Sequence, residues 1–335
     1  MALNPTMLLI VLLALSILIA FGIGANDETM APLVASGAIK LKYVLVIGAI
    51  VNIIGSVLLG GFVSETLGSE LLQPVARTEN YILAIIISTS IFLILSSFKG
   101  LPVSTTVSVV GSVIGVGLYF LAMNGTDPVL WGGFFEVFIG WIFSPILGLI
   151  VSIGVYWFIR RYILTRPKGL RGIERMEQFF VFGLVGLVIA TGFSRAGNDV
   201  GNAVGVLTGF QGSITLPDVI VLLLIGGIGI GAGLFVLGRR VLRNIGKNII
   251  EMRPSDAFAI QTSVLIILLA ATLLGFPISG TVILVFAIIG NSIIKHMRFN
   301  RRTIKNIILS WSLTIPITLA VSMGICTLLF MVNPI

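Results

Sequence analysis

Gly24-Ala25-Asn26-Asp27 returns 172 residues later as Ala196-Gly197-Asn198-Asp199, in a chain of 335 residues. A second string, Gly100-Leu101-Pro102-Val103-Ser104-Thr105-Thr106, returns after 175 residues as Gly275-Phe276-Pro277-Ile278-Ser279-Gly280-Thr281. A looser third match sets Trp141 and Pro145 against Trp311 and Pro316. Three matches in the same order at a nearly constant offset indicate an internal duplication.

The composition makes the lipid bilayer the solvent of this chain. Hydrophobic residues make up 57% of it, charged residues only 10%, and the mean hydropathy is +1.13. Ordinary soluble domains have roughly a quarter charged residues. Ten continuous apolar runs are of the length that predicts membrane-crossing helices, and they lack the alternation of barrel strands. The runs are 7–24, 43–63, 81–97, 103–122, 134–159, 179–196, 217–237, 257–274, 279–294 and 307–331.

Each copy of the duplication contains five runs, an odd number, so the second copy is predicted to sit upside down relative to the first. Inverted repeats recur in secondary transporters, which bind substrate and coupling ion near the bilayer midplane. We therefore predict an all-α membrane protein of about ten transmembrane helices with broken or re-entrant segments. Its parts are a first repeat (1–159), a basic cytoplasmic linker (160–177) and a second, inverted repeat (178–335).

The distribution of positive charge predicts the topology. The net charge is +8, but the Lys and Arg residues concentrate in the connections after the fifth, seventh and ninth runs. The connections after the fourth, sixth and eighth runs contain none. This alternation follows the positive-inside rule and gives no indication of nucleic-acid binding. It predicts a multi-pass protein of the cell (inner) membrane with basic loops in the cytoplasm and both termini outside, Arg77 being the one basic residue in an outer loop.

Two stretches after the repeated Asn-Asp pairs, 27–40 and 199–212, are predicted to be broken or re-entrant. Each holds a segment of about 12 small and apolar residues, which as a helix spans only about 18 Å, too short to cross the bilayer. Irregular backbone at membrane depth is tolerated where it lines a polar cavity. The sequence leaves open whether each stretch continues the preceding helix or forms a hairpin.

Ionisable and amide side chains at membrane depth are costly and are candidates for function. A single motif of this kind is also compatible with helix packing and capping, but two symmetric copies favour a binding site. The candidate ligands of a coupling cation are Asp27, Asp199, Asn26, Asn198, Asn202 and Glu28, with Na⁺ expected at Asp27 and Asp199.

The second repeated motif predicts an anion site. Proline followed by Ser or Thr starts a helix whose free N–H groups and hydroxyls can bind an anion. An ordinary capped helix start is the alternative for either copy alone. The candidate substrate ligands are Ser104, Thr105, Thr106, Ser279, Thr281, Asn26, Asn198 and Arg195.

Anionic Asp27 and Asp199 would repel a bound oxyanion unless something neutralises them. A bound Na⁺, a proton on Asp27, Glu28 or Asp199, or an ion pair with Arg195 would each do so. The argument predicts symport without naming the cation.

At these residues the chain resembles the inorganic phosphate transporter (PiT) family, whose duplicated signatures read roughly Gly-x-Asn-Asp-Val-x-Asn-x and Gly-x-Pro-x-Ser-x-Thr. The resemblance covers both halves. It implies Na⁺- or H⁺-coupled phosphate symport, with the Asn-Asp and Ser/Thr positions lining the sites and no cofactor beyond the coupling ion. The chain departs from the family pattern at Glu28-Thr29-Met30, at Val107 and at Gly280, and its linker is short.

Three alternatives stay open at this point. A related branch of the family resembles sulfate permeases, although it tends to lose the Asn-Asp pairs retained here. A cation antiporter would also use inverted repeats with intramembrane acids, but would not need Ser/Thr-bearing helix starts. An intramembrane enzyme is disfavoured, because the single Cys326 and single His296 form no catalytic or metal-binding cluster in the sequence. A homodimer is a further hypothesis.

Overall fold

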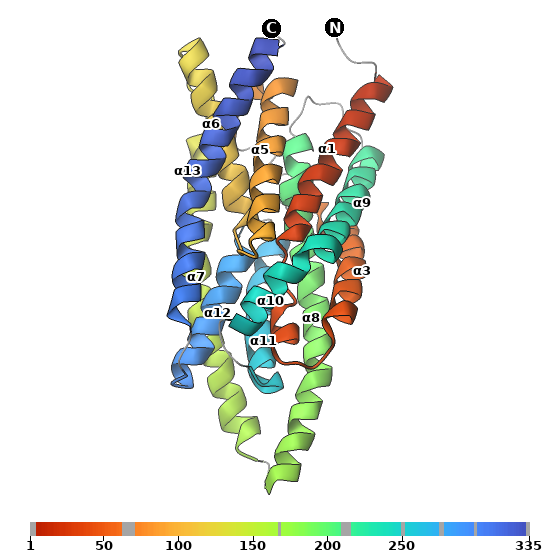
Figure 1. The fold of residues 1–335 in the computed structure, drawn as a ribbon, viewed down its shortest axis with the longest axis vertical. Helices are drawn as coiled ribbons and strands as arrows, with labels where there is room; N and C mark the ends of the chain where they lie inside the picture. Colours follow the sequence, from red (N-terminus) through yellow and green to blue (C-terminus); the bar gives the residue numbers. More distant parts are fainter. Residues whose placement is uncertain are drawn as a thin grey trace.

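A computed structural model describes residues 5–61, 71–166, 169–208, 216–248, 252–274, 278–297 and 300–332 (Figure 1). Apart from an isolated bridge between Leu72 and Val129, the regular structure of these residues is helical. The helices of the first half are α1 (Pro5–Ala25), α2 (Ala31–Ala35), α3 (Leu41–Leu59), η1 (Pro74–Ala76), α5 (Glu79–Phe98), α6 (Thr105–Asn124), α7 (Trp131–Ile159) and the π-helical turn η2 (Arg160–Leu164). Those of the second half are α8 (Gly169–Thr208), α9 (Leu216–Gly233), the π-helical turn η3 (Leu234–Gly238), α10 (Arg239–Asn248), α11 (Pro254–Leu273), α12 (Gly280–Ile294) and α13 (Arg301–Val332).

Ten of the described helices correspond to the ten apolar runs of the sequence. Eight helical segments are long and apolar enough to cross a membrane, and α1 and α12 contribute shorter apolar helices. The outer faces of these helices expose large apolar side chains such as Phe135, Ile150 and Leu309, which only a lipid environment would cover. The predicted fold class, an all-α membrane protein, is confirmed.

The two halves interlock rather than standing apart. Helix α1 packs mainly against α9 and α3 packs against both α8 and α9, while α6 packs against α13 and α12 against α7. The sequence offset makes α1 equivalent to α8, α3 to α9, α6 to α12 and α7 to α13. The α1–α9 contact is therefore the counterpart of the α3–α8 contact, and the α6–α13 contact is the counterpart of the α7–α12 contact. In Figure 1 α1 descends from the N-terminal end while α8 rises from the opposite end, as an inverted repeat requires.

Small residues allow the close approach of these helices. A Cβ atom on Gly148 of α7 would lie 2.6 Å from the carbonyl oxygen of Ile283 on α12. On the other side of the same contact, a Cβ on Gly290 would lie 2.7 Å from the carbonyl oxygen of Leu149. Small residues at such positions let helices pack in lipid.

Two large hydrophobic clusters and one small one form among the described residues, and the chain passes between the two large clusters at the repeated Asn-Asp pairs. One cluster contains Ile23 and Val200, and the other contains Met30 and Val188. The polar residues 26–29 and 195–199 therefore lie at the boundary between the two clusters, where both copies of the repeat change from one cluster to the other.

The helix breaks after the first Asn-Asp pair, whereas after the second it continues, which decides for the described residues between the two forms that the sequence left open. Helix α1 ends at Ala25 and only the short α2 precedes α3, but α8 runs without interruption through Asp199 to Thr208. The Asp27 carboxylate accepts bonds from Thr29 N–H and Oγ1 and so stabilises a turn. Asp199 instead binds Arg195 one helical turn earlier, which leaves the helix intact. Residues 209–212 lie outside the described part.

The linker predicted at 160–177 is largely helical. Helix α7 continues into the π-helical turn η2, and α8 already begins at Gly169. The end of η2 and the start of α8 lie at the end of the bundle opposite the start of α1 and the end of α13 (Figure 1).

Candidate functional site

The turn after α1 presents a buried carboxylate held by three donors. Asp27 Oδ1 accepts hydrogen bonds from the Thr29 backbone N–H at 2.9 Å and the Thr29 hydroxyl at 2.6 Å. Its Oδ2 accepts one from the Asn52 side-chain amide of α3 at 3.1 Å. The turn thus fixes a carboxyl group at the boundary of the two hydrophobic clusters.

Asn26 holds the first Gly-x-Pro-x-Ser-x-Thr motif in place. Its Nδ2 donates to the Leu101 carbonyl at 3.0 Å and to the Ser97 hydroxyl at 3.1 Å, and its Oδ1 accepts from the Val103 N–H at 2.9 Å. These bonds tie the Asn-Asp turn to the segment that leads into α6. Asn26 therefore positions the motif, and its amide is already engaged by protein groups.

Both Ser/Thr motifs start helices, as predicted. The Ser104 hydroxyl oxygen accepts the Val107 N–H of α6 and the Ser279 hydroxyl oxygen accepts the Val282 N–H of α12, each at 3.3 Å. The two starts meet, since the Thr281 hydroxyl donates to the Val103 carbonyl at 3.4 Å. Two helix N-termini with buried hydroxyls thus converge, although Gly275-Phe276-Pro277 lie outside the described residues.

One face of α8 carries the second set of candidates. Asn198, Asp199 and Asn202 stand three, four and seven residues after Arg195, which places the four side chains on one face of a helix. All four are buried. Asn202 Nδ2 donates to the Asn198 carbonyl at 3.0 Å.

Arg195 joins the two Asn-Asp motifs. Its Nη1 donates to Glu28 Oε1 at 2.6 Å and its Nε to Asp199 Oδ2 at 2.9 Å, and all three side chains are buried. Its Nη2 donates to the Thr281 hydroxyl at 3.4 Å, and the Thr105 hydroxyl donates to Asp199 Oδ1 at 3.4 Å. The guanidinium thus links both Asn-Asp motifs to the start of α12.

Gly280 makes room for that guanidinium. A Cβ atom at this position would lie 2.5 Å from Arg195 Nη1 and 3.0 Å from its Cζ. The departure from the family pattern at Gly280 thus has a steric cause. The same position in the first repeat holds Thr105, which faces Asp199 without such crowding.

The sequence profile of the phosphate transporter family matches residues 23–322. The chain belongs to the phosphate transporter family.

Related proteins cover nearly the whole chain. A Chlamydia trachomatis protein assigned as a phosphate permease is 29% identical over 90% of this chain and 94% of its own length. The chloroplast inorganic phosphate transporter 2-1 of Arabidopsis thaliana is 27% identical over 96% of this chain and 72% of its own length. A solved structure of a sodium-dependent phosphate transporter superposes with a TM-score of 0.86 at 27% identity, covering 97% of this chain and 99% of that one. Its family makes the chain a membrane transporter rather than an enzyme, as predicted.

Two residues of the polar centre could not be predicted from the motifs alone. Asn52 of α3 binds Asp27, and Gln261 of α11 donates from Nε2 to the Thr29 carbonyl at 3.3 Å. Both are lone amides inside apolar runs, a signal that the rule for polar groups at membrane depth would have found.

Several buried oxygens at this centre have no hydrogen-bond partner among the described residues. Such atoms are expensive to bury unless a ligand, ion or water satisfies them. They are Glu28 Oε2, Asn52 Oδ1, Asn202 Oδ1, Gln261 Oε1 and Thr106 Oγ1. Four of the five are carboxylate or amide oxygens, the ligand type that hard cations prefer.

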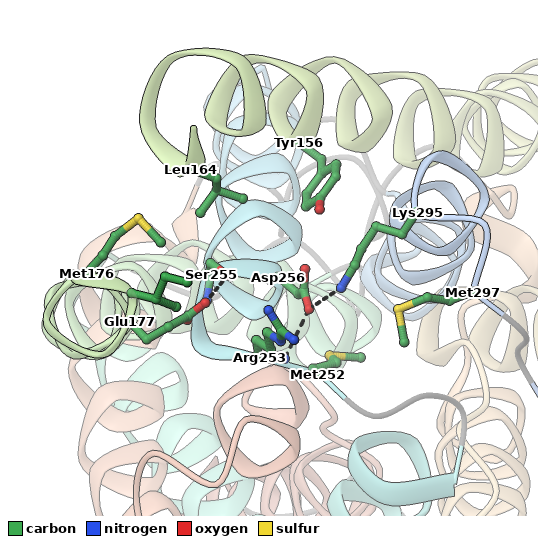
Figure 2. Close-up of a pocket in the computed structure, with 11 residues that line it drawn as sticks. Tyr156, Leu164, Met176, Glu177, Met252, Arg253, Ser255, Asp256, Lys295 and Met297 are labelled. Atoms are coloured by element: carbon green, nitrogen blue, oxygen red, sulfur yellow. Dashed lines mark hydrogen bonds and ion pairs between the residues drawn. The ribbon is translucent and has the colours of Figure 1, made fainter. Parts of the chain in front are cut away.

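A separate cavity of about 550 Å³ lies at the basic end of the bundle, between the ends of α7, α8, α11 and α12 (Figure 2). In Figure 2 Lys295 and Asp256 point toward each other beneath Tyr156, and their charged atoms are 2.6 Å apart. The Glu177 carboxylate accepts bonds from the Ser255 N–H at 2.9 Å and hydroxyl at 2.8 Å. No candidate site residue lines this cavity, so we do not assign it to the transport site.

Proposed function

We propose that this protein imports inorganic phosphate by symport with Na⁺. Phosphate would bind where the starts of α6 and α12 meet, and Na⁺ would bind at the Asp27 turn and beside Asp199. Membership of the phosphate transporter family supports the substrate. The similarity to a sodium-dependent phosphate transporter supports the coupling ion.

The observation that carries the proposal is an excess of buried acid beside an anion site. Asp27, Glu28 and Asp199 give three negative charges and Arg195 gives one positive charge, so the formal sum is −3 + 1 = −2. Burying uncompensated charge is costly, and adding a phosphate anion raises that cost further. Cations that bind with the substrate remove the excess, which makes binding of anion and cation interdependent.

Individual residues have distinct parts in this proposal. The hydroxyls of Ser104, Thr105, Thr106, Ser279 and Thr281 would bind phosphate oxygens together with the N–H groups at the two helix starts. The unpartnered oxygens of Asn52, Asn202, Gln261 and Glu28 support cation binding near Asp27 and Asp199. Asn26 would act by holding the first motif, since its amide already makes three bonds to protein.

The orientation in the membrane belongs to the same proposal. We place the connections that follow α7 and α12, which contain Arg160, Arg161 and Lys295, in the cytoplasm of an inner cell membrane. Both termini would then lie outside, and phosphate would enter from their side.

The test is uptake of radiolabelled phosphate by proteoliposomes that contain the purified protein. An imposed Na⁺ gradient is compared with an imposed proton gradient, and excess sulfate is added as competitor. We expect accumulation that requires Na⁺, resists sulfate and is lost in Asp27→Asn and Asp199→Asn. Uptake driven by protons alone would contradict Na⁺ coupling, and accumulation of labelled sulfate in place of phosphate would contradict the substrate.

A further inference from the structure

Among the positions at which the two copies of the internal repeat differ, three concern the charged groups of the polar centre. Arg195 in the second copy corresponds to Ile23 in the first, and Glu28 in the first corresponds to Val200 in the second. Gly280 in the second copy corresponds to Thr105 in the first. The arginine, the glutamate and the glycine are therefore each present in one copy of the repeat only.

These three positions meet at one point of the structure. Arg195 Nη1 lies 2.6 Å from Glu28 Oε1, and a Cβ on Gly280 would lie 2.5 Å from the same nitrogen. The arginine has thus gained both a carboxylate partner and the space for its head group. Both of its acidic partners and the arginine itself are buried, so solvent does not screen their charges.

The surroundings of the guanidinium are those of a bound cation. It lies between the carboxylates of Glu28 and Asp199 and against the hydroxyl oxygen of Thr281. It is covalently attached to α8, however, and cannot be released on either side of the membrane. We infer that Arg195 is a built-in counter-cation that takes the place of one transported cation. The inference rests on the proposed symport and concerns the number of cations moved with each phosphate.

If the net charge of the polar centre sets the number of cations moved with each phosphate, isosteric substitutions should change the number of cations in steps of one. The native centre sums to −2, from three carboxylates and one guanidinium. Glu28→Gln gives −1, Arg195→Gln gives −3, and the double variant E28Q/R195Q returns the sum to −2. We expect Glu28→Gln to move one cation fewer than the native protein, and the double variant to move the same number. Arg195→Gln should need one cation more.

The stoichiometry is measured in proteoliposomes from the limiting phosphate accumulation and the potential at which net phosphate flux stops. Under an Na⁺ gradient of about tenfold and no membrane potential, one cation fewer lowers the limiting accumulation about tenfold by mass action. As a second readout, phosphate binding to the purified protein is measured against Na⁺ concentration. The cooperativity of this Na⁺ dependence should fall in Glu28→Gln, rise in Arg195→Gln and keep its native value in the double variant. Arg171→Gln, which removes an exposed charge from the same helix, is the matched control and should leave both readouts unchanged.

Each outcome has one meaning. Removing one partner of a buried ion pair is strongly destabilising, so Arg195→Gln can fail to fold; the Glu28→Gln and double variants then decide the question. An unchanged stoichiometry in Glu28→Gln, or a double variant that differs from the native protein, overturns the counter-cation while leaving phosphate symport intact. Absence of cation-dependent uptake in the native protein would instead overturn the proposed function itself.

Discussion

The side chains around Asp27 show how a membrane-buried carboxylate is kept in place. Thr29 binds one of its oxygens, and Asn52 binds the other while leaving its own Oδ1 without a partner among the described residues. An amide that donates to a carboxylate and keeps its own oxygen without a partner among the described residues is suited to share a cation with it. Asn52 thus joins α3 to the candidate cation site.

We therefore predict that Asn52→Ala lowers the affinity for the coupling cation about tenfold, the scale seen when groups that orient metal ligands are removed. The measurement is the Na⁺ concentration that gives half-maximal phosphate uptake, and phosphate affinity at saturating Na⁺ should change little. Asn306→Ala, at an exposed position of α13, is the control. An unchanged Na⁺ dependence in Asn52→Ala would exclude α3 from the cation site.

Sequence patterns could predict the polar centre only in part. The spacing of Arg195, Asp199 and Asn202 already places them on one helix face, and the proline-led Ser104 and Ser279 predict helix starts. The partners across the bundle could not be predicted, because pairing of Arg195 with Glu28 joins residues 167 positions apart. The same holds for the steric role of Gly280, which is set by a side chain on another helix.

At the scale of single elements, the starts of α6 and α12 combine a structural and a binding role. The Ser104 and Ser279 oxygens each accept one N–H of their own helix, and the remaining N–H groups of the first turn stay available to a ligand. Loss of either cap should therefore affect stability and substrate binding together.

We predict that Ser104→Ala and Ser279→Ala each lower the free energy of unfolding by about 1 kcal/mol, the usual value of a serine N-cap. Each should also raise the phosphate concentration needed for half-maximal uptake. Thermal unfolding and uptake kinetics are measured on the same preparations. Ser312→Ala, exposed on α13, should change neither. Lower stability with unchanged phosphate dependence would leave these serines as caps only.

The contact between α7 and α12 depends on glycine. Leucine at Gly148 would collide with the Ile283 backbone, whereas Gly154 of the same helix has no neighbouring atom within 4 Å of a Cβ. We predict that Gly148→Leu lowers the free energy of unfolding by about 1–3 kcal/mol, the typical cost of overpacking. Gly154→Leu should be nearly neutral. Comparable melting temperatures for the two variants in the same detergent would show that α7 and α12 do not require this close approach.

The two copies of the repeat do not form the same local backbone structure. The two Asn-Asp pairs are identical in sequence, yet one ends a helix and the other lies within one. The difference comes from neighbours: Thr29 binds Asp27 locally, whereas Arg195 binds Asp199 along the helix. A repeat detected in sequence thus predicts equivalent positions, but side chains outside the repeated string decide the local backbone.

At the scale of the whole molecule, the two inverted halves interleave so that each supplies one helix start and one Asn-Asp motif to a common centre. Helix α7 spans the bundle between the exposed Thr126 at one end and the exposed Thr165 at the other. Its 29 residues extend about 43 Å, enough to separate these two threonines across a bilayer. They are therefore a matched pair for testing the orientation.

We predict that Thr126 faces the outside and Thr165 the cytoplasm, because the basic connection after α7 should stay on the cytoplasmic side. Each threonine is replaced by cysteine in a Cys326→Ser background, which removes the only native thiol. A membrane-impermeant maleimide should label T126C in intact cells, and T165C only after the membrane is permeabilised. Phosphate uptake by the background variant serves as the control for folding. The opposite labelling pattern would reverse the orientation, and labelling of both sites in intact cells would contradict a membrane-spanning α7.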